Sequence, residues 1–354
     1  MTRPIILVSG GTGGHLFPAI ALEKALKDQG ATALILTDTR GAQYINPDDL
    51  LNDRLSINHQ TGSFQKGIGV FKDFFKTRTL FKKLNPVCVI GFGGYPTLAP
   101  LWAAHSLKIP IIIHEQNALM GKANRLITPI AQKIALSFER TFGIRDKNQS
   151  KCTYIGNPVR PEILSFQNQQ KPISSTDKFN ILIIGGSQGA KIFSDIMPDA
   201  IALLPNDIQK QLKITQQVRP EYLEETSAKY KNLSAEIELS SFFQQMGEKI
   251  INTDLMICRA GASTIAENLV LGCPALYIPL PSAAENHQYI NAKEIERLKS
   301  GILIEQKNLT PASLATEILH YFHNRTDLVE IKTQSKVNAR PQAAENLANL
   351  IIQA

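Results

Sequence analysis

Two short aliphatic runs, each followed at once by a glycine-rich turn, constrain the fold of this chain more than any other feature. They are Ile5-Ile6-Leu7-Val8 before Gly10-Gly11-Thr12-Gly13-Gly14, and Ile181-Leu182-Ile183-Ile184 before Gly185-Gly186-Ser187-Gln188-Gly189. Continuous apolar runs of this length are typical of strands buried on both faces of a parallel sheet. Glycines after such a strand allow a tight turn, and the following helix offers free N–H groups to a phosphate. The pair predicts two α/β halves that handle a nucleotide diphosphate.

The same alternation of strand and helix patterns continues along the chain, which indicates a doubly wound α/β architecture. At 354 residues the chain is long enough for two domains. We expect strands at 4–9, 32–37, 87–91, 110–114 and 133–137, and again at 180–185, 212–216, 235–239, 254–258 and 275–279. A helix is expected to open near Phe17-Pro18 and run to Gly30, and a short amphipathic helix is expected at 342–353.

Composition narrows the class of protein without choosing a function. Hydrophobic residues make up 43% of the chain and charged residues 19%, as in ordinary globular proteins. The cysteines (Cys88, Cys152, Cys258 and Cys273) form no CxxC pair, so we expect reduced thiols of a cytosolic protein. We expect no signal peptide at the start of the chain, and no apolar stretch approaches the ~20 residues that span a bilayer. The net charge of +7 favours anionic partners, but no nucleic-acid-binding module is present.

The spacing of the glycines tests the dinucleotide-binding fingerprint directly. A GxGxxG motif that began at Gly11 would need glycine at position 16, where Leu16 stands. The second turn, from Gly185 to Gly189, fails the same spacing, and neither turn continues as a Walker A loop. The pattern therefore argues against a nicotinamide-dependent oxidoreductase.

Polar residues gather where predicted strands end, which is the edge at which α/β sheets bind ligands. His15 follows the first glycine turn, and its imidazole, with an unperturbed pKa of ~6.5, suits a general base at neutral pH. The other groups are Gly91-Phe92-Gly93-Gly94-Tyr95, His114-Glu115-Gln116-Asn117, and the segment from Arg259 to Glu267. Each has a plain structural interpretation as well, namely a loop or the polar first turn of a helix.

Seven motifs in one order resemble the MurG family, the family 28 glycosyltransferases. They are Gly10 to His15, Gly91 to Tyr95, His114 to Asn117, Gly156-Asn157-Pro158-Val159-Arg160, Gly185 to Ala190, Arg259 to Glu267, and Asn286-His287-Gln288-Tyr289-Ile290-Asn291-Ala292. The resemblance covers nearly the whole chain. It implies the GT-B fold, α/β, with two Rossmann-like domains whose parallel sheets face each other across a cleft. It also implies an acceptor- and membrane-facing domain at 1–160, joined by a C-terminal helix at about 341–354, and a UDP-sugar domain at 161–340.

The resemblance implies an inverting transfer in peptidoglycan synthesis, and hence roles in cell shape and cell division. N-acetylglucosamine would pass from UDP-GlcNAc to the 4-hydroxyl of MurNAc-pentapeptide on undecaprenyl pyrophosphate, converting lipid I to lipid II. The enzyme would act at the cytoplasmic face of the bacterial plasma membrane, near other cell-wall synthesis proteins. No cofactor is implied.

Site residues follow from the same resemblance, position by position. In the second domain, the backbone at Phe243 would contact the uracil, and Glu267 would hold the ribose hydroxyls. The diphosphate would be bound by Ser187 and by the loop Ala262, Ser263, Thr264, Ile265 and Ala266. Gln288 and Asn291 would contact the sugar. In the first domain, Thr12, Gly13, Gly14 and Asn117 would close over the reaction centre, with Arg160 offsetting phosphate charge. The chain departs from the family pattern at Phe243, Pro96-Thr97 and His287. The change at Phe243 matters little if its contact is through the backbone, whereas the change at Pro96-Thr97 leaves the acceptor contacts open.

The chemistry needs a base and a way to stabilise the leaving diphosphate. We expect His15 to be the base, with Glu115 as a second candidate or as the partner that orients His15. Because the chain has no Asp-x-Asp, we expect metal-independent chemistry. A related GT-B enzyme, such as a UDP-N-acetylglucosamine 2-epimerase or a glycolipid synthase, and a non-catalytic nucleotide-sugar sensor are the alternatives. The first is disfavoured by the Gly156–Arg160 and His114–Asn117 motifs, and the second would need no base.

A basic and aromatic segment between Ser63 and Pro86 is the predicted membrane surface. It carries Lys66, Lys72, Lys76, Arg78, Lys82 and Lys83 against a single acid, Asp73, with Phe64, Phe71, Phe74, Phe75, Leu80 and Phe81 between them. An amphipathic helix with its apolar side in the core would give a similar pattern. The excess of phenylalanine and the single sign of charge favour a peripheral contact with anionic lipid.

Overall fold

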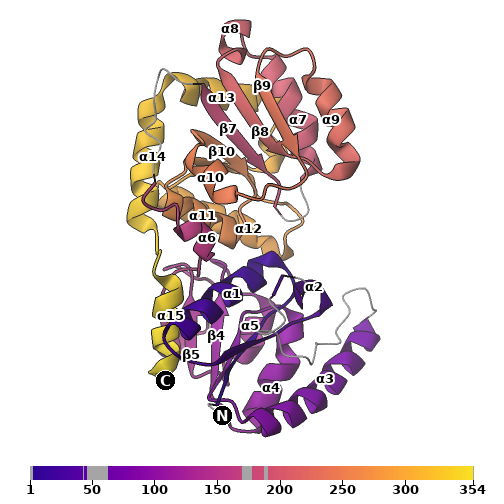
Figure 1. The fold of residues 1–354 in the computed structure, drawn as a ribbon, viewed down its shortest axis with the longest axis vertical. Coiled ribbons are helices and arrows are strands. Elements are labelled where there is room, and N and C mark those ends of the chain that lie inside the picture. The colour runs from indigo at the N-terminus through magenta and orange to yellow at the C-terminus, as the bar shows by residue number, and fades with distance from the viewer. Residues whose placement is uncertain (1–2, 43, 46–62, 170–177, 187–189, 354) are drawn as a thin grey trace. The chain divides into compact units, whose positions relative to one another are not determined.

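The computed structural model describes residues 3–42, 44–45, 63–169, 178–186 and 190–353, with the backbone alone for 63–69. The chain divides into two compact units (Figure 1). Unit 1 comprises Met1–Arg160 and Arg340–Ala354, and unit 2 comprises Pro161–Ala339. Each unit is an α/β layer structure built on a six-stranded sheet in which every pair of neighbouring strands is parallel.

The strands of unit 1 are β1 (Ile5–Val8), β2 (Ala33–Leu36), β3 (Val89–Gly91), β4 (Ile111–Glu115), β5 (Lys133–Leu136) and β6 (Cys152–Tyr154), in the order β2-β1-β3-β4-β5-β6. The helices are α1 (Gly13–Asp28), α2 (Thr39–Ala42), α3 (Ser63–Leu84), α4 (Leu98–Ser106), α5 (Lys122–Ile127) and α15 (Ala343–Ile352), with 3-10 turns at Tyr95–Thr97 and Asp146–Lys151.

Alternate residues of one strand serve two cores in unit 1. Ile5 and Leu7 pack beneath α1 and α15, whereas Ile6 and Val8 pack beneath α3, α4 and α5. Because both faces are covered, the strand reads as a continuous apolar run and not as an alternating one. Leu347 of α15 is fully buried in the first of these cores, so the C-terminal helix is part of unit 1.

The strands of unit 2 are β7 (Phe179–Ile184), β8 (Leu212–Gln217), β9 (Glu236–Ser240), β10 (Leu255–Cys258), β11 (Ala275–Tyr277) and β12 (Ile302–Leu303), in the order β12-β11-β10-β7-β8-β9. The helices are α6 (Pro161–Leu164), α7 (Lys191–Ala202), α8 (Asn206–Gln209), α9 (Leu223–Tyr230), α10 (Met246–Ile251), α11 (Ala262–Leu271), α12 (His287–Arg297), α13 (Pro311–His323) and α14 (Arg325–Asn338), with 3-10 turns at Pro220–Tyr222, Ala284–Asn286 and Gln306–Asn308. Phe193 and Met197 of α7 pack with Ile318 of α13 over one face of this sheet.

Every strand expected from the sequence is confirmed, to within one or two residues at its ends. The short edge strands β6 and β12 were not expected. The expected start of the first helix is wrong, because α1 begins at Gly13 and places Pro18 in its second turn. Proline has no N–H, so the carbonyl of Gly14 receives no helical hydrogen bond from Pro18. The described cysteines are all free thiols, as expected.

The strand orders predict where ligands bind. In unit 1 the chain reverses direction along the sheet between β1 and β3, whose ends pair at Val8 and Gly91. In unit 2 the corresponding reversal lies between β7 and β10, paired at Ile184 and Cys258. Crevices at the carboxyl ends of such neighbouring strands are the binding sites of doubly wound sheets. Both glycine-rich turns follow strands at these switch points.

Candidate active site and nucleotide-binding loops

The first glycine turn is held to the neighbouring strand by Asp38, which follows β2. Asp38 is buried and accepts hydrogen bonds from the N–H of Gly11 (3.2 Å), the N–H of Gly41 (3.2 Å) and the guanidinium of Arg40 (2.6 Å). Burial alone would raise the pKa of Asp38, but Arg40 and the two amides lower it below its usual value. A Cβ at Gly11 would collide with this carboxylate, so only glycine fits there.

His15 lies in the first turn of α1, at the β1/β3 switch point. Its Nδ1 is 3.0 Å from Oε1 of Gln116, the residue that follows β4. The ring packs against Gly93 and Gly94, which have φ of +80° and +83°. A side chain at either position would be strained by the backbone. The structure therefore brings His15, the turn at Gly93 and Gly94, and the end of β4 together.

Glu115 is a buried carboxylate whose hydrogen bonds argue against its use as a second base. It is 1% exposed, and its two oxygens accept four hydrogen bonds. Oε1 accepts from the N–H and the Nδ2 of Asn117 (2.9 and 3.3 Å), and Oε2 accepts from the N–H of Gly121 (3.0 Å) and the Nδ2 of Asn124 (2.8 Å). A carboxylate so occupied offers little to a substrate proton. His15 itself is hydrogen-bonded to Gln116, the next residue of the same motif.

The remaining predicted residues of unit 1 lie around the start of α1. Thr12 and Gly14 are exposed, Gly13 is half-buried, and Thr12 makes no side-chain capping bond to the helix. The guanidinium carbon of Arg160 sits 4.8 Å from the ring centroid of Phe17, which holds the Arg160 side chain beside this helix. The adjoining Asn157 is buried, and neither of its amide atoms has a hydrogen-bond partner among the described residues.

In unit 2, α11 begins directly after β10 and carries the residues expected to meet the donor. Its N-cap, Gly261, provides no side-chain acceptor for the first-turn N–H groups. The Oγ of Ser263 is buried and lacks a hydrogen-bond partner in the part of the chain that the structure describes. A helix N-terminus with an unsatisfied hydroxyl suits an anion. Thr264, Ile265 and Ala266 complete the turn, and Glu267 is a buried carboxylate in the next turn.

Ser187, the other residue expected at the diphosphate, lies outside the described residues. The turn to which it belongs is described only at Gly185 and Gly186, and again from Ala190, the N-cap of α7.

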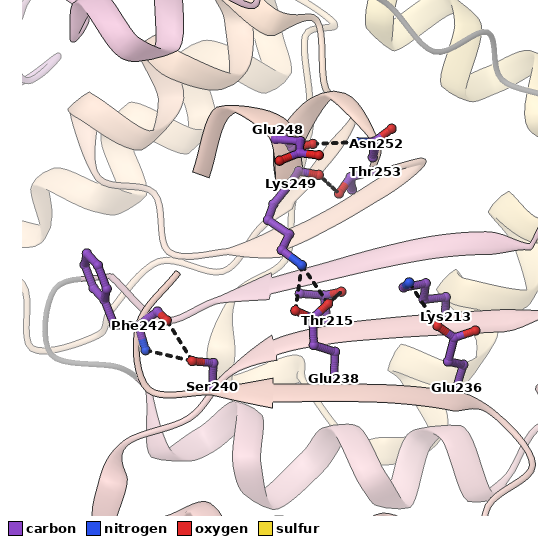
Figure 2. A network of polar contacts seen from close by, with 10 residues as sticks. All are labelled: Lys213, Thr215, Glu236, Glu238, Ser240, Phe242, Glu248, Lys249, Asn252 and Thr253. Atoms are coloured by element: carbon purple, nitrogen blue, oxygen red, sulfur yellow. Dashed lines mark hydrogen bonds and ion pairs between the residues drawn. The ribbon is translucent and has the colours of Figure 1, made fainter. Parts of the chain in front are cut away.

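The loop after β9 carries Phe243 and is anchored by an ion pair, which Figure 2 shows. Nζ of Lys249 lies 2.6 and 2.7 Å from the two carboxylate oxygens of Glu238 and 5.5 Å from the ring centroid of Phe243. The hydrogen bond from Lys249 is the main cause that lowers the pKa of Glu238. In the same loop Phe242 is 71% exposed, and its backbone is bonded to the Oγ of Ser240.

The segment between β11 and α12 has an unusual backbone. Glu285 and Asn286 both adopt positive φ (51° and 57°), a conformation that non-glycine residues adopt at a cost. Oε1 of Gln288 accepts from the N–H of Leu280 (2.9 Å) and closes the segment. Asn291 is fully buried, with its Nδ2 donating to the carbonyl of Ala260 (3.1 Å). This hydrogen bond supports the backbone before α11, and the contact of Asn291 with the sugar stays a prediction.

Sequence reasoning missed two residues of this site, Asp38 and Asn124, and gave His114 and Gln116 no individual role. His114 and Gln116 stand in the polar motif after β4, so residue type and position pointed at them, but not at their contacts. Asp38 and Asn124 stand outside that motif, and only the fold brings Asp38 to Gly11 and Asn124 to Glu115.

The predicted membrane segment forms α3, and its apolar residues divide between core and surface. Phe81 is buried, and Phe74 and Leu80 pack against the core, so these three do not belong to an outer patch. Phe71 and Phe75 are 66% and 51% exposed, and their rings touch edge to face. Nothing is described of the side chains of Phe64 and Lys66. None of the described helices has the length and apolarity needed to cross a bilayer.

No cluster of three or more metal-ligating side chains occurs within the described ranges.

Comparisons with known proteins place both domains and the whole chain in one family of transferases. Residues 5–136 match the glycosyltransferase family 28 N-terminal domain, and residues 180–347 match the glycosyltransferase family 28 C-terminal domain. A protein of Rickettsia bellii is 39% identical over 357 residues, covering 99% of both chains. One of Zymomonas mobilis is 37% identical over 358 residues, covering 99% of this chain and 92% of that one. Both are named UDP-N-acetylglucosamine--N-acetylmuramyl-(pentapeptide) pyrophosphoryl-undecaprenol N-acetylglucosamine transferase.

Among solved structures, MurG of Acinetobacter baumannii superposes with a TM-score of 0.81 at 28% identity, over the full length of both chains. A UDP-GlcNAc 2-epimerase of Neisseria meningitidis bound to UDP-GlcNAc superposes with a TM-score of 0.71. At 13% identity, the second likeness shows the fold alone.

Proposed function

The chain belongs to glycosyltransferase family 28, and from that premise we propose how its residues perform the transfer for which its relatives are named. The chain is an N-acetylglucosaminyltransferase of peptidoglycan synthesis. It moves N-acetylglucosamine from UDP-N-acetylglucosamine to N-acetylmuramyl-(pentapeptide) pyrophosphoryl-undecaprenol. The roles of individual residues and the contact with the membrane are the parts that we propose.

His15 is the general base, and the observation that carries this proposal is its place at the β1/β3 switch point with Nδ1 bonded to Gln116. The imidazole takes the proton of the acceptor's 4-hydroxyl as that oxygen bonds to the anomeric carbon of the donor. The bond from this carbon to the diphosphate oxygen breaks at the same time, and UDP leaves with the electron pair. A single displacement of this kind inverts the anomeric configuration. Glu115 has no part in the proton transfer.

Unit 2 binds the donor. The N-terminal turn of α11 with the unsatisfied hydroxyl of Ser263 takes the diphosphate, and Glu267 takes the ribose. The backbone at Phe243, in the loop held by Lys249, meets the uracil, and Gln288 meets the sugar. Charge that develops on UDP is stabilised by helix N–H groups and by the guanidinium of Arg160. Since the sequence has no Asp-x-Asp, we propose that this step needs no divalent cation.

The outer face of α3 is the membrane contact. Phe71 and Phe75 supply the apolar part, and the exposed Lys72, Lys82 and Lys83 lie on the same helix. Fully burying a phenylalanine side chain is worth about 1.5–3 kcal/mol, and each basic residue near anionic lipid adds about 1 kcal/mol. The sum supports reversible binding that weakens as salt is added.

Release of UDP from UDP-N-acetylglucosamine, measured with and without the polyprenyl-linked acceptor, tests this function. We expect release that depends on the acceptor and persists in EDTA. Equal release without the acceptor would indicate a hydrolase, and no release in either case would indicate an epimerase or a binding protein. Complete loss of activity in EDTA would contradict the metal-free step.

A further inference from the structure

His15, Gln116 and His114 form a chain of hydrogen bonds that runs from the switch point into the core of unit 1. Nδ1 of His15 is 3.0 Å from Oε1 of Gln116, and Nε2 of Gln116 is 3.1 Å from Nδ1 of His114. Nε2 of His114 lies 3.3 Å from the carbonyl oxygen of Gly156 and 3.2 Å from the Oγ of Ser137. Each imidazole nitrogen in this series of hydrogen bonds donates if it is protonated and accepts if it is not. The amide of Gln116 accepts through its oxygen and donates through its NH₂ group, so its role depends on its orientation.

Two main-chain carbonyls determine which atom donates in each of these hydrogen bonds, because a carbonyl oxygen only accepts. The carbonyl of His114 is 3.2 Å from one end of the Gln116 amide, so that end is the NH₂ group. The reversed amide would set two oxygens against each other at this distance. The same carbonyl also accepts from the Nδ2 of Asn124 (3.1 Å). The oxygen of Gln116 is therefore the atom that faces His15.

The second carbonyl, that of Gly156, fixes the state of His114. Nε2 of His114 must carry a proton to donate to it, and Nδ1 must be unprotonated to accept from the NH₂ of Gln116. His114 is thus the neutral Nε2–H tautomer. Its complete burial agrees with this state, since burial is the main cause that lowers the pKa of His114 to about 4.

We propose that Gln116 and His114 are positioning residues that hold His15 as the Nδ1–H tautomer and leave its Nε2 lone pair to accept the acceptor's proton. Oε1 of Gln116 can only accept, so Nδ1 of His15 must donate. The assignment of the tautomer rests on this geometry, and its catalytic use rests on the proposed role of His15 as base. An amide can present either end to a histidine, so Gln116 alone would not select a tautomer. His114 makes the selection by occupying the NH₂ end.

A neutral orienting group differs chemically from the carboxylate that orients the base in Ser-His-Asp enzymes. A carboxylate beside His15 would favour the imidazolium form and so reduce the fraction of free base. It would also be repelled by the His114 carbonyl, which lies 3.2 Å from Nε2 of Gln116. Gln116 accepts from Nδ1–H whether His15 is neutral or protonated, so the hydrogen bond persists through the proton transfer.

Nitrogen-15 NMR of the full chain, labelled at histidine, reads the tautomer without any assay of activity. The His15 signals are assigned by their loss in His15→Gln. Above the pH at which His15 titrates, we expect a protonated Nδ1 and an unprotonated Nε2. A protonated Nε2 in the wild-type protein would overturn the proposal.

Gln116→Met keeps the length of the side chain but removes both amide groups, and Gln132→Met is the matched control. Gln132 lies in the same unit, where its Oε1 accepts from the N–H of Ile111 at the opposite end of β4. In Gln116→Met we expect the Nε2–H tautomer to appear. We also expect kcat to fall by roughly 10- to 100-fold, which does not exceed the 10²–10⁴-fold that a general base contributes in total, with KM for the donor nearly unchanged.

The two levels of the proposal fail separately. An unchanged tautomer in folded Gln116→Met would refute the positioning role. A shifted tautomer with unchanged kcat would keep the positioning role and refute His15 as the base. In Gln132→Met both the tautomer and kcat should match the wild type. If Gln116→Met does not fold, the wild-type spectrum still decides the tautomer.

Discussion

Replacing Glu115 by glutamine should destabilise unit 1 without removing a catalytic base. The carboxylate accepts four N–H bonds, two on each oxygen. In Glu115→Gln one oxygen becomes an NH₂ group, so either the pair from Asn117 or the pair from Gly121 and Asn124 loses its acceptor. Hydrogen bonds to a charged group contribute about 1.5–3 kcal/mol each, so losing two lowers the free energy of unfolding by about 3–6 kcal/mol.

Urea unfolding followed by tryptophan fluorescence measures this effect in the correct unit, because the single tryptophan, Trp102, lies in α4 of unit 1. Glu139→Gln is the control: Glu139 is an exposed carboxylate of the same unit, and we expect a change within about 0.5 kcal/mol. The kcat of Glu115→Gln, corrected for the folded fraction, should remain far above that of His15→Ala. Unchanged stability together with a kcat as low as that of His15→Ala would refute this reasoning and identify Glu115 as the base.

Three further predictions concern acidic pH, the membrane and the donor. Burial lowers the pKa of His114 to about 4, whereas in the unfolded chain it has the ordinary value of about 6.5. The free energy of unfolding therefore falls as the pH drops from about 6.5 to about 4, by roughly 3 kcal/mol. Urea titrations at pH 7 and pH 4 should show this loss in the wild type but not in His114→Phe. Replacing Phe71 and Phe75 by serine should reduce cosedimentation with anionic vesicles at least about 10-fold, given about 1.5–3 kcal/mol per buried phenylalanine. Lys249→Met removes an ion pair and a cation–π contact, so KM for UDP-GlcNAc should rise about 3- to 10-fold with little change in kcat.

Matched controls decide these predictions. Lys213→Met removes an ion pair to Glu236 on the same sheet, drawn in Figure 2, and should leave KM unchanged. Leu203→Ser removes an exposed apolar side chain of unit 2 and should leave vesicle binding unchanged. Equal effects in control and variant would show that the contact in question has no specific role. An equal loss of stability at low pH in His114→Phe would show that other groups cause it.

The strands were predictable because a strand that is buried on both faces has a continuous apolar sequence, as at Ile5–Val8. The edge strands β6 and β12 were missed because each is short and partly exposed, so Cys152–Tyr154 carries no such run. The division of α3 could have been found from its helical period. Phe74 and Phe81 are seven residues apart and face the core, while Phe71 and Phe75 are four apart and face outward.

The site was predictable as a set of loops but not as a set of contacts. Parallel strands end at one edge, so the motif at His114–Asn117 was expected near His15. The contacts of each residue in that motif depend on groups elsewhere in the fold. Gly121 and Asn124 donate hydrogen bonds to Glu115, and the carbonyl of Gly156 lies against Nε2 of His114. Residue types alone favoured the carboxylate as the partner of His15, and the structure shows the amide in that place.

The most direct test of the central claim is acceptor-dependent UDP release by His15→Ala at saturating donor and acceptor. If His15 is the base, kcat falls by about 10²–10⁴-fold while the affinity for UDP-GlcNAc is retained, because the residues that we propose to bind the donor, apart from Arg160, belong to unit 2. A His15→Ala protein that releases UDP at the wild-type rate would contradict the account.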